Sequence, residues 1–250
     1  MTTVILLRHG RSTANVSGVL AGRSPGVALD DHGRAQAEKL LGRLDGIPIA
    51  AAVTSPMQRC QETLAPLLAE RGLEADVEED LAEVDYGEWT GKTLGELGKE
   101  DLWKVVQAHP SAAVFPGGEG LAGMQSRSVA AIRRQAARVA AEHGDRAIWV
   151  ACSHGDVIKA AVADALGLHL DSFQRIVVDP CSVSVISYTP TRPFVVRVND
   201  TGGDLSSLVP PPPKPADENG DGTGDGSGDG SGDAGAVSSE ATVGGSTGVA

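Results

Sequence analysis

Two stretches of the chain place a histidine directly after a run of apolar residues. The first is VILLRHG at residues 4–10, which contains Arg8 and His9, and the second is IWVACSHG at residues 148–155, which contains His154. Burying a histidine beside an arginine costs several kcal/mol of desolvation unless an anionic group joins them. The first stretch therefore predicts a site for a negatively charged ligand, and the second predicts another histidine at an equivalent place.

A third apolar run is followed by an arginine. Residues 49–54 are strand-like, and the SPMQ that follows has Ser at the expected cap and Pro at the first helical position, so Arg59 falls on the first turn of a helix. In open α/β sheets, ligands bind at the carboxyl ends of the strands. We therefore expect His9, His154 and Arg59 to lie together at one edge of a sheet.

Strand-like and helical patterns alternate along the chain, as in an α/β protein. The expected strands cover residues 3–7, 49–54, 75–77, 147–152, 183–188 and 194–198. The expected helices begin at a cap on Asp30 or Asp31 and at Ser55, cover 93–108 weakly and 121–142 as one long helix, and follow His154 through Ala165. We predict a three-layer αβα sandwich around a mostly parallel central sheet.

Further motifs occur in order along the chain. They are Arg8-His9-Gly10, Asn15, residues 29–36 with Gly33, Ser55-Pro56 with Arg59, LAEVDYGEWTG at 81–91, PGGEG at 116–120 and Ser153-His154-Gly155. This ordered set, which spans nearly all of residues 3–200, resembles the histidine phosphatase superfamily, in the branch that contains the cofactor-dependent phosphoglycerate mutases. The resemblance implies a phosphoryl-transfer enzyme with the predicted sandwich fold.

The resemblance also implies roles for the residues at the sheet edge. His9 is expected to attack phosphorus through a neutral ring nitrogen and to form a phosphohistidine, which divides one difficult displacement into two easier ones. Arg8 and Arg59 offer forked donors to the phosphoryl oxygens, and the remaining positions suit the Asn15 amide and His154, if that ring is protonated. Because these groups supply positive charge, we expect neither a metal ion nor a cofactor.

A carboxyl group is needed to protonate the leaving alkoxide and later to activate water. By resemblance, Glu83 takes this role. Its neighbours Glu79, Asp80, Asp85 and Glu88 are acidic too, so an alternative interpretation is that the whole stretch is a solvated loop.

Cations near the expected phosphate site bear on the substrate. Arg11 stands where Glu or Gln is common in this branch, and Gly22 and Arg23 belong to a loop that resembles the substrate-contacting loop of the family. These three are candidate substrate-binding residues, and the added charge favours a substrate with a second anionic group. An alternative is that Arg11 pairs with one of the acids near Glu83.

The expected function is hydrolysis of a small phosphorylated metabolite through a phosphohistidine. Two alternatives remain: a phosphomutase of the phosphoglycerate mutase type, and a non-catalytic phospho-binding module. His154 follows Glu83 by only about 70 positions, which leaves little chain for the closing lid that a mutase needs. A nucleophile together with an acid and base favours an enzyme over a binding module.

Composition divides the chain into two parts. We assign residues 1–201 to the histidine phosphatase domain and residues 202–250, a run of prolines followed by a Gly-, Ser- and Asp-rich sequence, to a disordered acidic tail. The chain carries a formal net charge of −12, so general binding to nucleic acid is not expected.

Three cysteines without a CxxC pair predict free thiols in a reducing compartment. The opening residues lack a basic segment, and no apolar run approaches the roughly 18 residues that span a membrane. We therefore expect a cytoplasmic protein without membrane attachment, whose partner is a small phosphoester substrate. The sequence leaves the oligomeric state open.

Overall fold

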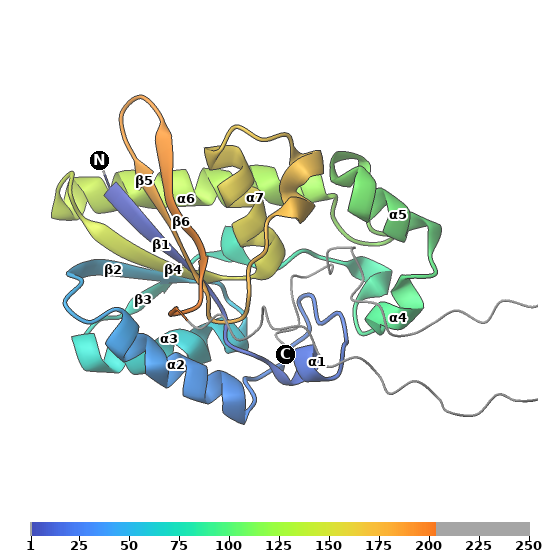
Figure 1. Ribbon diagram of the computed structural model, residues 1–250, viewed down its shortest axis with the longest axis horizontal. Helices are drawn as coiled ribbons and strands as arrows, with labels where there is room; N and C mark the ends of the chain where they lie inside the picture. The colour runs from blue at the N-terminus through green and yellow to red at the C-terminus, as the bar shows by residue number, and fades with distance from the viewer. Residues whose placement is uncertain (1, 204–250) are drawn as a thin grey trace, which may run out of the picture.

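The computed structural model describes residues 2–203, and a six-stranded sheet forms its centre (Figure 1). The strands are β1 (Thr2–Arg8), β2 (Ile49–Thr54), β3 (Ala75–Val77), β4 (Ile148–Ser153), β5 (Val183–Tyr188) and β6 (Pro193–Asp200). They lie in the order β3-β2-β4-β1-β5-β6, and among them β5 alone runs against the others. The predicted, mostly parallel sheet is therefore confirmed. Most of the predicted tail, residues 204–250, lies outside the described residues.

Helices cover both faces of the sheet, which confirms the three-layer sandwich. Helices α2 (Asp31–Arg43) and α3 (Gln58–Arg71) lie on one face, and α6 (Leu121–His143) and α7 (Gly155–Ala165) lie on the other (Figure 1). Shorter elements fill the connections: α1 (Thr13–Val16), α4 (Leu94–Leu97), α5 (Asp101–Ala108) and the 3₁₀ helices η1 (Glu79–Leu81), η2 (Gly87–Trp89), η3 (Pro110–Ala112) and η4 (Leu170–Arg175).

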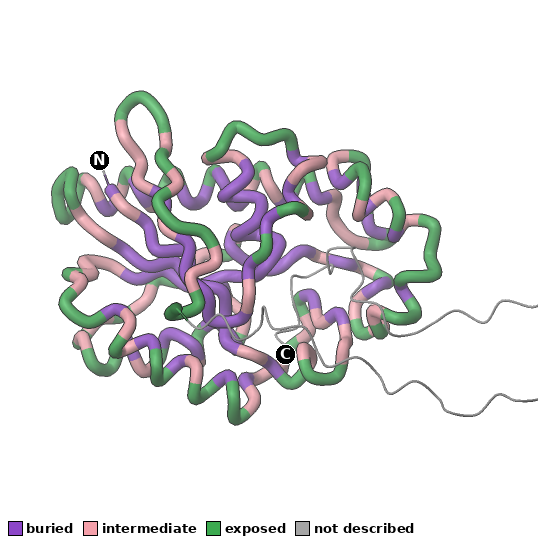
Figure 2. The backbone as a smooth tube through the Cα atoms, in the orientation of Figure 1, coloured by how far each residue is buried: buried purple, intermediate pink, exposed green. Residues whose placement is uncertain are grey.

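The apolar runs of β1 and β4 occupy the middle of the sheet because both of its faces are covered there. Along β1, Val4 and Leu6 join the core under α6 and α7, whereas Ile5 and Leu7 join the core under α2 and α3. Successive side chains of a strand point to opposite faces, so a strand covered on both sides needs a continuous apolar run. Figure 2 shows the buried backbone concentrated in these strands and in α7.

The start of α3 differs from the sequence prediction. The helix begins at Gln58 with Met57 as its N-cap, and not at Ser55-Pro56. The Ser55 hydroxyl accepts a hydrogen bond from the Met57 amide at 3.3 Å, but its shortest contact is with Nε2 of His154 at 2.7 Å. Ser55 therefore belongs to the site at the sheet edge and not to the helix end.

The three cysteines are free thiols, as the sequence predicted, and all three are buried. Cys60 lies on α3, Cys152 on β4, and Cys181 shortly before β5. No helix within residues 2–203 is both long enough and apolar enough to cross a membrane.

Candidate active site

The carboxyl ends of β1 and β4 bring the two histidines together. Arg8 lies opposite Ser153 in the parallel pairing, and the His9 amide donates to the Ser153 carbonyl at 3.0 Å. The rings of His9 and His154 meet edge to face with their centroids 5.3 Å apart. Arg59 reaches the same place from the first turn of α3 and contacts His154. The three residues expected at this edge therefore meet there.

The hydrogen bonds of His9 determine which ring nitrogen can react. Nδ1 lies 2.8 Å from the Gly10 carbonyl oxygen, which can only accept, so Nδ1 carries the proton and Nε2 keeps its lone pair. The Gly10 amide is itself held by the Thr63 hydroxyl at 2.9 Å. Burial, together with the charges of Arg59 and Arg8, holds the pKa of His9 well below its ordinary value. The ring is therefore neutral at physiological pH.

His154 is held in the complementary way. Nη2 of Arg59 lies 3.0 Å from Nδ1 of His154, and because a guanidinium cannot accept, Nδ1 carries no proton. The proton on Nε2 is donated to the Ser55 hydroxyl at 2.7 Å. Burial and the charges of Arg59, His9 and Arg8 hold the pKa of His154 well below its ordinary value. The role expected for this ring required its protonated form, and the arrangement favours the neutral form.

Both arginines are buried and anchored by main-chain carbonyls. Nη1 of Arg8 donates to the Val178 oxygen at 2.7 Å, and Nη2 of Arg59 donates to the Gly22 oxygen at 2.9 Å. Burial lowers the pKa of Arg8, and the charge of Glu83 opposes this effect. An arginine stays protonated in a protein even so, because its ordinary pKa lies far above neutral pH. Two fixed cations with forked donors suit a phosphoryl group.

Glu83 lies beside His154 and is only 4% exposed. Its Oε1 accepts from the Val84 amide at 3.0 Å, and its Oε2 is 3.8 Å from Nδ1 of His154. Burial and the charge of Asp156 raise the pKa of Glu83 to about 7, although Arg59 opposes the shift. A carboxyl group with this pKa can donate and accept protons at neutral pH. Because Glu83 is buried, the alternative that the entire acidic stretch is a solvated loop is wrong.

Asn15 and Arg11, in the segment after β1, make local contacts. Oδ1 of Asn15 accepts from the amide and the hydroxyl of Ser12, both at 2.9 Å, in a capping box for α1. Nε of Arg11 lies 2.7 Å from Oδ2 of Asp30, the N-cap of α2. Arg11 therefore pairs with Asp30, and not with an acid near Glu83 as the alternative expected. Direct contact of Asn15 or Arg11 with a substrate stays a prediction.

Arg23 belongs to a cluster that sequence patterns did not reveal. Its Nε donates to the Glu83 carbonyl at 2.8 Å, and its Nη2 donates to Oε1 of Glu119 at 2.9 Å. Arg127, on α6, binds both oxygens of the same Glu119 carboxylate. Glu119 stands in the PGGEG motif, which was a signal for it. Nothing in the sequence distinguishes Arg127 from the other arginines of its helix.

A buried polar network around Asp156 was also missed. Asp156 accepts from the Tyr86 hydroxyl at 2.8 Å, and the Lys159 ammonium lies 3.5 Å from its other oxygen. All three residues are buried. The sequence did offer a signal for Asp156, because this acid stands two residues after His154 in a helix of mostly small apolar residues. Its negative charge acts on Glu83 and contributes to the raised pKa of that carboxyl.

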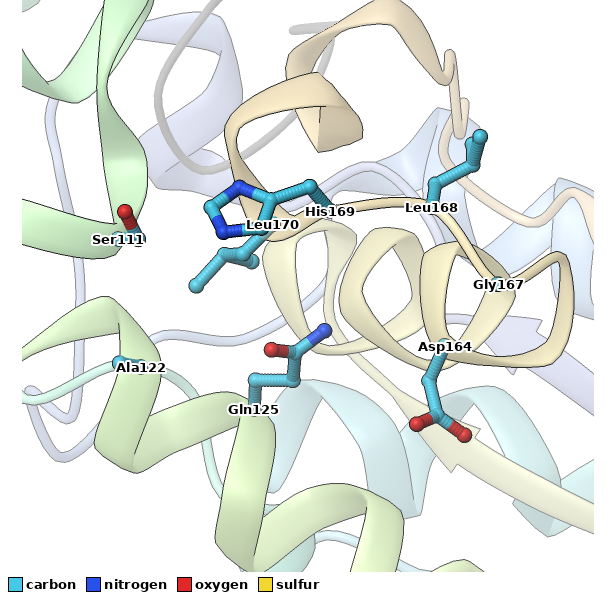
Figure 3. A pocket seen from close by; sticks show the side chains of 8 residues that line it. All are labelled: Ser111, Ala122, Gln125, Asp164, Gly167, Leu168, His169 and Leu170. Atoms are coloured by element: carbon cyan, nitrogen blue, oxygen red, sulfur yellow. The ribbon is translucent and has the colours of Figure 1, made fainter.

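Within residues 2–203, no three His, Cys, Asp or Glu side chains are grouped so that they could hold a metal ion. A separate pocket of about 540 Å³ (Figure 3) lies at the C-terminal end of α7, whereas His154 is the N-cap of that helix. It is lined by Ser111, Ala122, Gln125, Asp164, Gly167, Leu168, His169 and Leu170. The pocket shares no residue with the site at the sheet edge.

Comparison with known proteins identifies relatives of this chain. Residues 4–201 match the model of the histidine phosphatase superfamily, branch 1. Phosphoserine phosphatase 1 of Hydrogenobacter thermophilus is 28% identical over 207 residues, which cover 80% of this chain and 93% of that protein. The 2-carboxy-D-arabinitol-1-phosphatase of Triticum aestivum is 30% identical over 212 residues, which cover 82% of this chain but 41% of that protein. The solved structure of Bacillus stearothermophilus YhfR has a TM-score of 0.73 at 26% identity and covers 80% of this chain and 98% of its own.

The matched region begins within β1 and ends just after β6, so it includes every element that positions the two histidines, the two arginines and Glu83. The fold and the resemblance inferred from the sequence are both confirmed. The chain therefore belongs to the histidine phosphatase superfamily, branch 1.

Proposed function

We propose that this histidine-type phosphatase, a phosphoric monoester hydrolase, acts on a small phosphorylated metabolite through a phosphohistidine on Nε2 of His9 and without a metal ion. The observation that carries the proposal is the state of His9. The Gly10 carbonyl binds the proton on Nδ1, and the depressed pKa keeps Nε2 unprotonated beside Arg8 and Arg59. A nitrogen lone pair between two cations is suited to attack an anionic phosphoryl group.

The first step forms the phosphoenzyme. The Nε2 lone pair of His9 attacks phosphorus, the N–P bond forms, and the P–O bond to the leaving group breaks. Protonated Glu83 gives its proton to the departing alkoxide, which leaves as a neutral alcohol. Since the pKa of Glu83 is about 7, this form is available at neutral pH.

The second step releases phosphate. Water attacks the phosphorus of the phosphohistidine while the Glu83 carboxylate accepts a proton from it. The N–P bond breaks, its electron pair returns to Nε2 of His9, and inorganic phosphate leaves. Glu83 is then protonated again, and the enzyme has returned to its first state.

Fixed cations stabilise the transferring group in both steps. Arg8 and Arg59 direct their donors at phosphoryl oxygens, and the negative charge of the phosphoryl group raises the pKa of His154. Nδ1 of His154 can gain this proton, with Glu83 nearby, once Arg59 turns its Nη2 donor from Nδ1 to the phosphoryl group. With these donors in place, transition-state stabilisation does not require a divalent metal.

The substrate is proposed to carry a second anionic group. Arg23 and Arg11 are partly exposed in the segments around the site, and each already pairs with one carboxylate, Glu119 and Asp30 respectively. The two phosphatase relatives are named for phosphoserine and for 2-carboxy-D-arabinitol 1-phosphate, and both phosphoesters carry a carboxylate. O-phosphoserine and O-phosphoethanolamine differ by this carboxylate alone, so they form a matched pair. We expect kcat/KM to be at least about tenfold higher for phosphoserine, the effect of one charged hydrogen bond. Equal kcat/KM values for the two substrates would contradict the proposal that the enzyme recognises a second anionic group.

Trapping the phosphoenzyme tests the mechanism. A panel of radiolabelled phosphomonoesters is mixed with the enzyme, the reaction is stopped in base, and the labelled peptide is mapped. We expect the label on the peptide that contains His9 and none in His9→Ala. Release of phosphate and interconversion of 3- and 2-phosphoglycerate are measured in parallel. Binding without any label would favour a phospho-binding module, and interconversion that outpaces phosphate release would favour a mutase.

We also propose that the enzyme works in a reducing, cytoplasmic compartment. The three buried and unpaired thiols support this setting. Cell fractionation with antibodies against the protein tests it, and recovery of the protein outside the cytoplasm would contradict it.

A further inference from the structure

Hydrogen bonds from two arginines hold the segment that carries Glu83. Arg127 donates through Nη1 to the carbonyl oxygens of Asp80 and Ala82, at 2.7 and 2.8 Å, and through Nη2 to that of Glu83 at 3.2 Å. Arg23 donates through Nε to the same Glu83 carbonyl at 2.8 Å. Three carbonyl groups within four residues are thus bound by guanidinium groups and not by regular secondary structure.

Glu119 holds the two arginines in place. Its Oε1 accepts from Nη2 of Arg127 at 2.6 Å, from Nη2 of Arg23 at 2.9 Å and from the Asp85 amide at 2.9 Å. Its Oε2 accepts from Nε of Arg127 at 3.0 Å, which completes a two-point pair. Burial by itself raises the pKa of Glu119, but the hydrogen bonds from Arg127 and Asp85 lower the pKa below its ordinary value. The carboxylate is therefore ionised at neutral pH.

We propose that Arg127, acting with Glu119 and Arg23, is a positioning residue that fixes the Glu83 carboxyl for proton transfer to the leaving group. Arg127 touches the main chain of Glu83 and no reacting atom, so its effect is indirect. The inference rests on the proposed role of Glu83 as the acid and base.

Glu83 needs this support because, although its side chain is buried, few polar contacts within the described chain fix the direction of its carboxyl. The carboxyl accepts one hydrogen bond, from the adjacent Val84 amide, and lies 3.8 Å from His154. A catalytic carboxyl must come within about 2.6–3.2 Å of the atom that it protonates. A misplacement of about 1 Å costs roughly 100-fold in rate. The planar fork of Arg127 holds several carbonyls in a fixed geometry, whereas a lysine ammonium is a compact charge with three rotatable donors on a flexible stem.

The test compares two substrates that differ in their need for a proton. p-Nitrophenyl phosphate releases a stable phenolate, whereas an alkyl phosphate releases an alkoxide that requires an acid. We expect Arg127→Lys to lower kcat/KM about 10- to 100-fold for the alkyl phosphate and less than about 3-fold for p-nitrophenyl phosphate. The ratio kcat/KM is compared because it covers the steps up to release of the leaving group. Glu119→Gln keeps the shape, removes the charge and is expected to show the same selectivity.

Arg134→Met is the matched control. Arg134 lies about two turns further along α6 and binds the side chains of Asp80 and Glu78 at 2.8 and 3.3 Å. It therefore ties the same segment to the same helix without contacting the Glu83 carbonyl. We expect the ratio of the two kcat/KM values to stay at the wild-type level in this variant.

Equal losses on both substrates in Arg127→Lys and Glu119→Gln would overturn the inference, and so would the same selectivity in Arg134→Met. Glu83→Gln separates these outcomes from failure of the proposed function. If Glu83→Gln is selective and the cluster variants are not, the inference alone fails. If Glu83→Gln shows no selectivity, the proposed role of Glu83 fails, and the inference fails with it. Thermal unfolding confirms that each variant is folded, and Glu119→Gln carries the test if Arg127→Lys does not fold.

Discussion

His9 and His154 are the same residue type, but their neighbours place them in different states. His9 keeps its proton on Nδ1, which donates to a carbonyl, and so presents Nε2 as a nucleophile. His154 keeps its proton on Nε2, which donates to Ser55, and turns Nδ1 towards Arg59. Because the pKa of Glu83 is about 7, its protonated and ionised forms are both populated at neutral pH. Roles at this site therefore follow from individual hydrogen bonds and charges.

His9→Ala is expected to lower turnover by at least about 1,000-fold, because no other group can form the covalent intermediate. The ring is buried, packs on His154 and, within residues 2–203, bonds to the Gly10 carbonyl, so the free energy of unfolding should fall by about 1–3 kcal/mol. Steady-state kinetics and urea unfolding measure the two quantities. Turnover above a thousandth of the wild-type rate would argue against a phosphohistidine.

The pH dependence of activity follows from Glu83. For an alkyl phosphate, kcat/KM should fall as the pH rises above about 7, because the acid that protonates the leaving group ionises. In Glu83→Gln this fall should disappear, and the rate should be about 10²- to 10⁴-fold lower. Profiles of kcat/KM against pH for both proteins check this. If the fall persists in Glu83→Gln, it belongs to another group.

The same carboxyl makes stability depend on pH. Because its pKa is raised by folding, the folded protein binds this proton more tightly than the unfolded chain does. The resulting stabilisation is complete below the ordinary value of 4.5 and is lost as the pH rises towards about 7. Glu83→Gln cannot ionise at this position. As the pH rises from 4.5 to about 7, its free energy of unfolding should therefore increase by about 1–3 kcal/mol relative to that of the wild type. Urea unfolding measures the difference, and a difference that does not change with pH would contradict the raised pKa.

Glu119→Gln serves as the control of opposite sign. The pKa of Glu119 is lowered by folding, despite its burial, through the hydrogen bonds from Arg127 and Asp85. Its stabilisation is therefore present above the ordinary pKa and is lost as the pH falls. Relative to wild type, Glu119→Gln should lose stability as the pH rises through the acid range, the reverse of Glu83→Gln.

Helix α2 and the loop after β1 pack main chain against main chain at Gly33 and Gly10. A Cβ on Gly33, in the first turn of α2, would lie 2.0 Å from the Arg11 carbonyl oxygen. A Cβ on Gly10 would lie 2.8 Å from the Gly33 carbonyl oxygen. Helix α2 thus packs directly on the loop that follows His9, and the contact leaves no room for a side chain.

Gly33→Ala should therefore displace α2 from the catalytic loop. We expect it to cost more than about 2 kcal/mol of stability and to lower kcat, because overpacking moves the backbone next to His9. Gly42→Ala is the matched control, since Gly42 lies in the same helix with open space around it. That change should stabilise the protein by about 0.5–1 kcal/mol and leave kcat unchanged. Similar effects of the two substitutions would show that the close contact is not essential.

The topology of the sheet assembles the site from segments that are far apart in the chain. β1 and β4 are neighbours at the centre of the sheet, so the residues that follow them share one edge. Arg59 joins from α3, and Glu83 joins from the connection after β3. The site holds its positive charge on Arg8 and Arg59, although the chain as a whole has a formal net charge of −12. Local arrangement, and not overall charge, makes this edge a place for an anion.

A chelator is expected to change kcat/KM by less than about twofold, because the two arginines, joined by His154 when the bound phosphoryl group favours its protonation, supply the charge that a metal ion would otherwise bring to the phosphoryl oxygens. Assays before and after prolonged incubation with a chelator, followed by addition of divalent ions, test this. Loss of activity that a divalent ion restores would overturn the assignment of the site.

Sequence patterns were sufficient for the order and type of the main elements. The strands at 49–54, 75–77 and 183–188 have the predicted limits, because apolar runs and turn residues are local properties of the chain. The meeting of His9 and His154 was also predictable, since each follows an apolar strand and parallel strands end at a common edge. His9, His154 and Arg59 each follow the end of a strand, so a short motif in the sequence was enough to identify them.

Side-chain partners and protonation states needed the folded chain. Ser55 was predicted as a helix cap but contacts His154, because this bond depends on two strand ends that are distant in sequence. Nothing in the sequence pointed to Arg127, which reaches the Glu83 carbonyl from another element. The raised pKa of Glu83 comes first from burial, and burial is a property of all the atoms packed around a group. Desolvation and long-range hydrogen bonds exist only once distant segments have come together, so no local pattern encodes them.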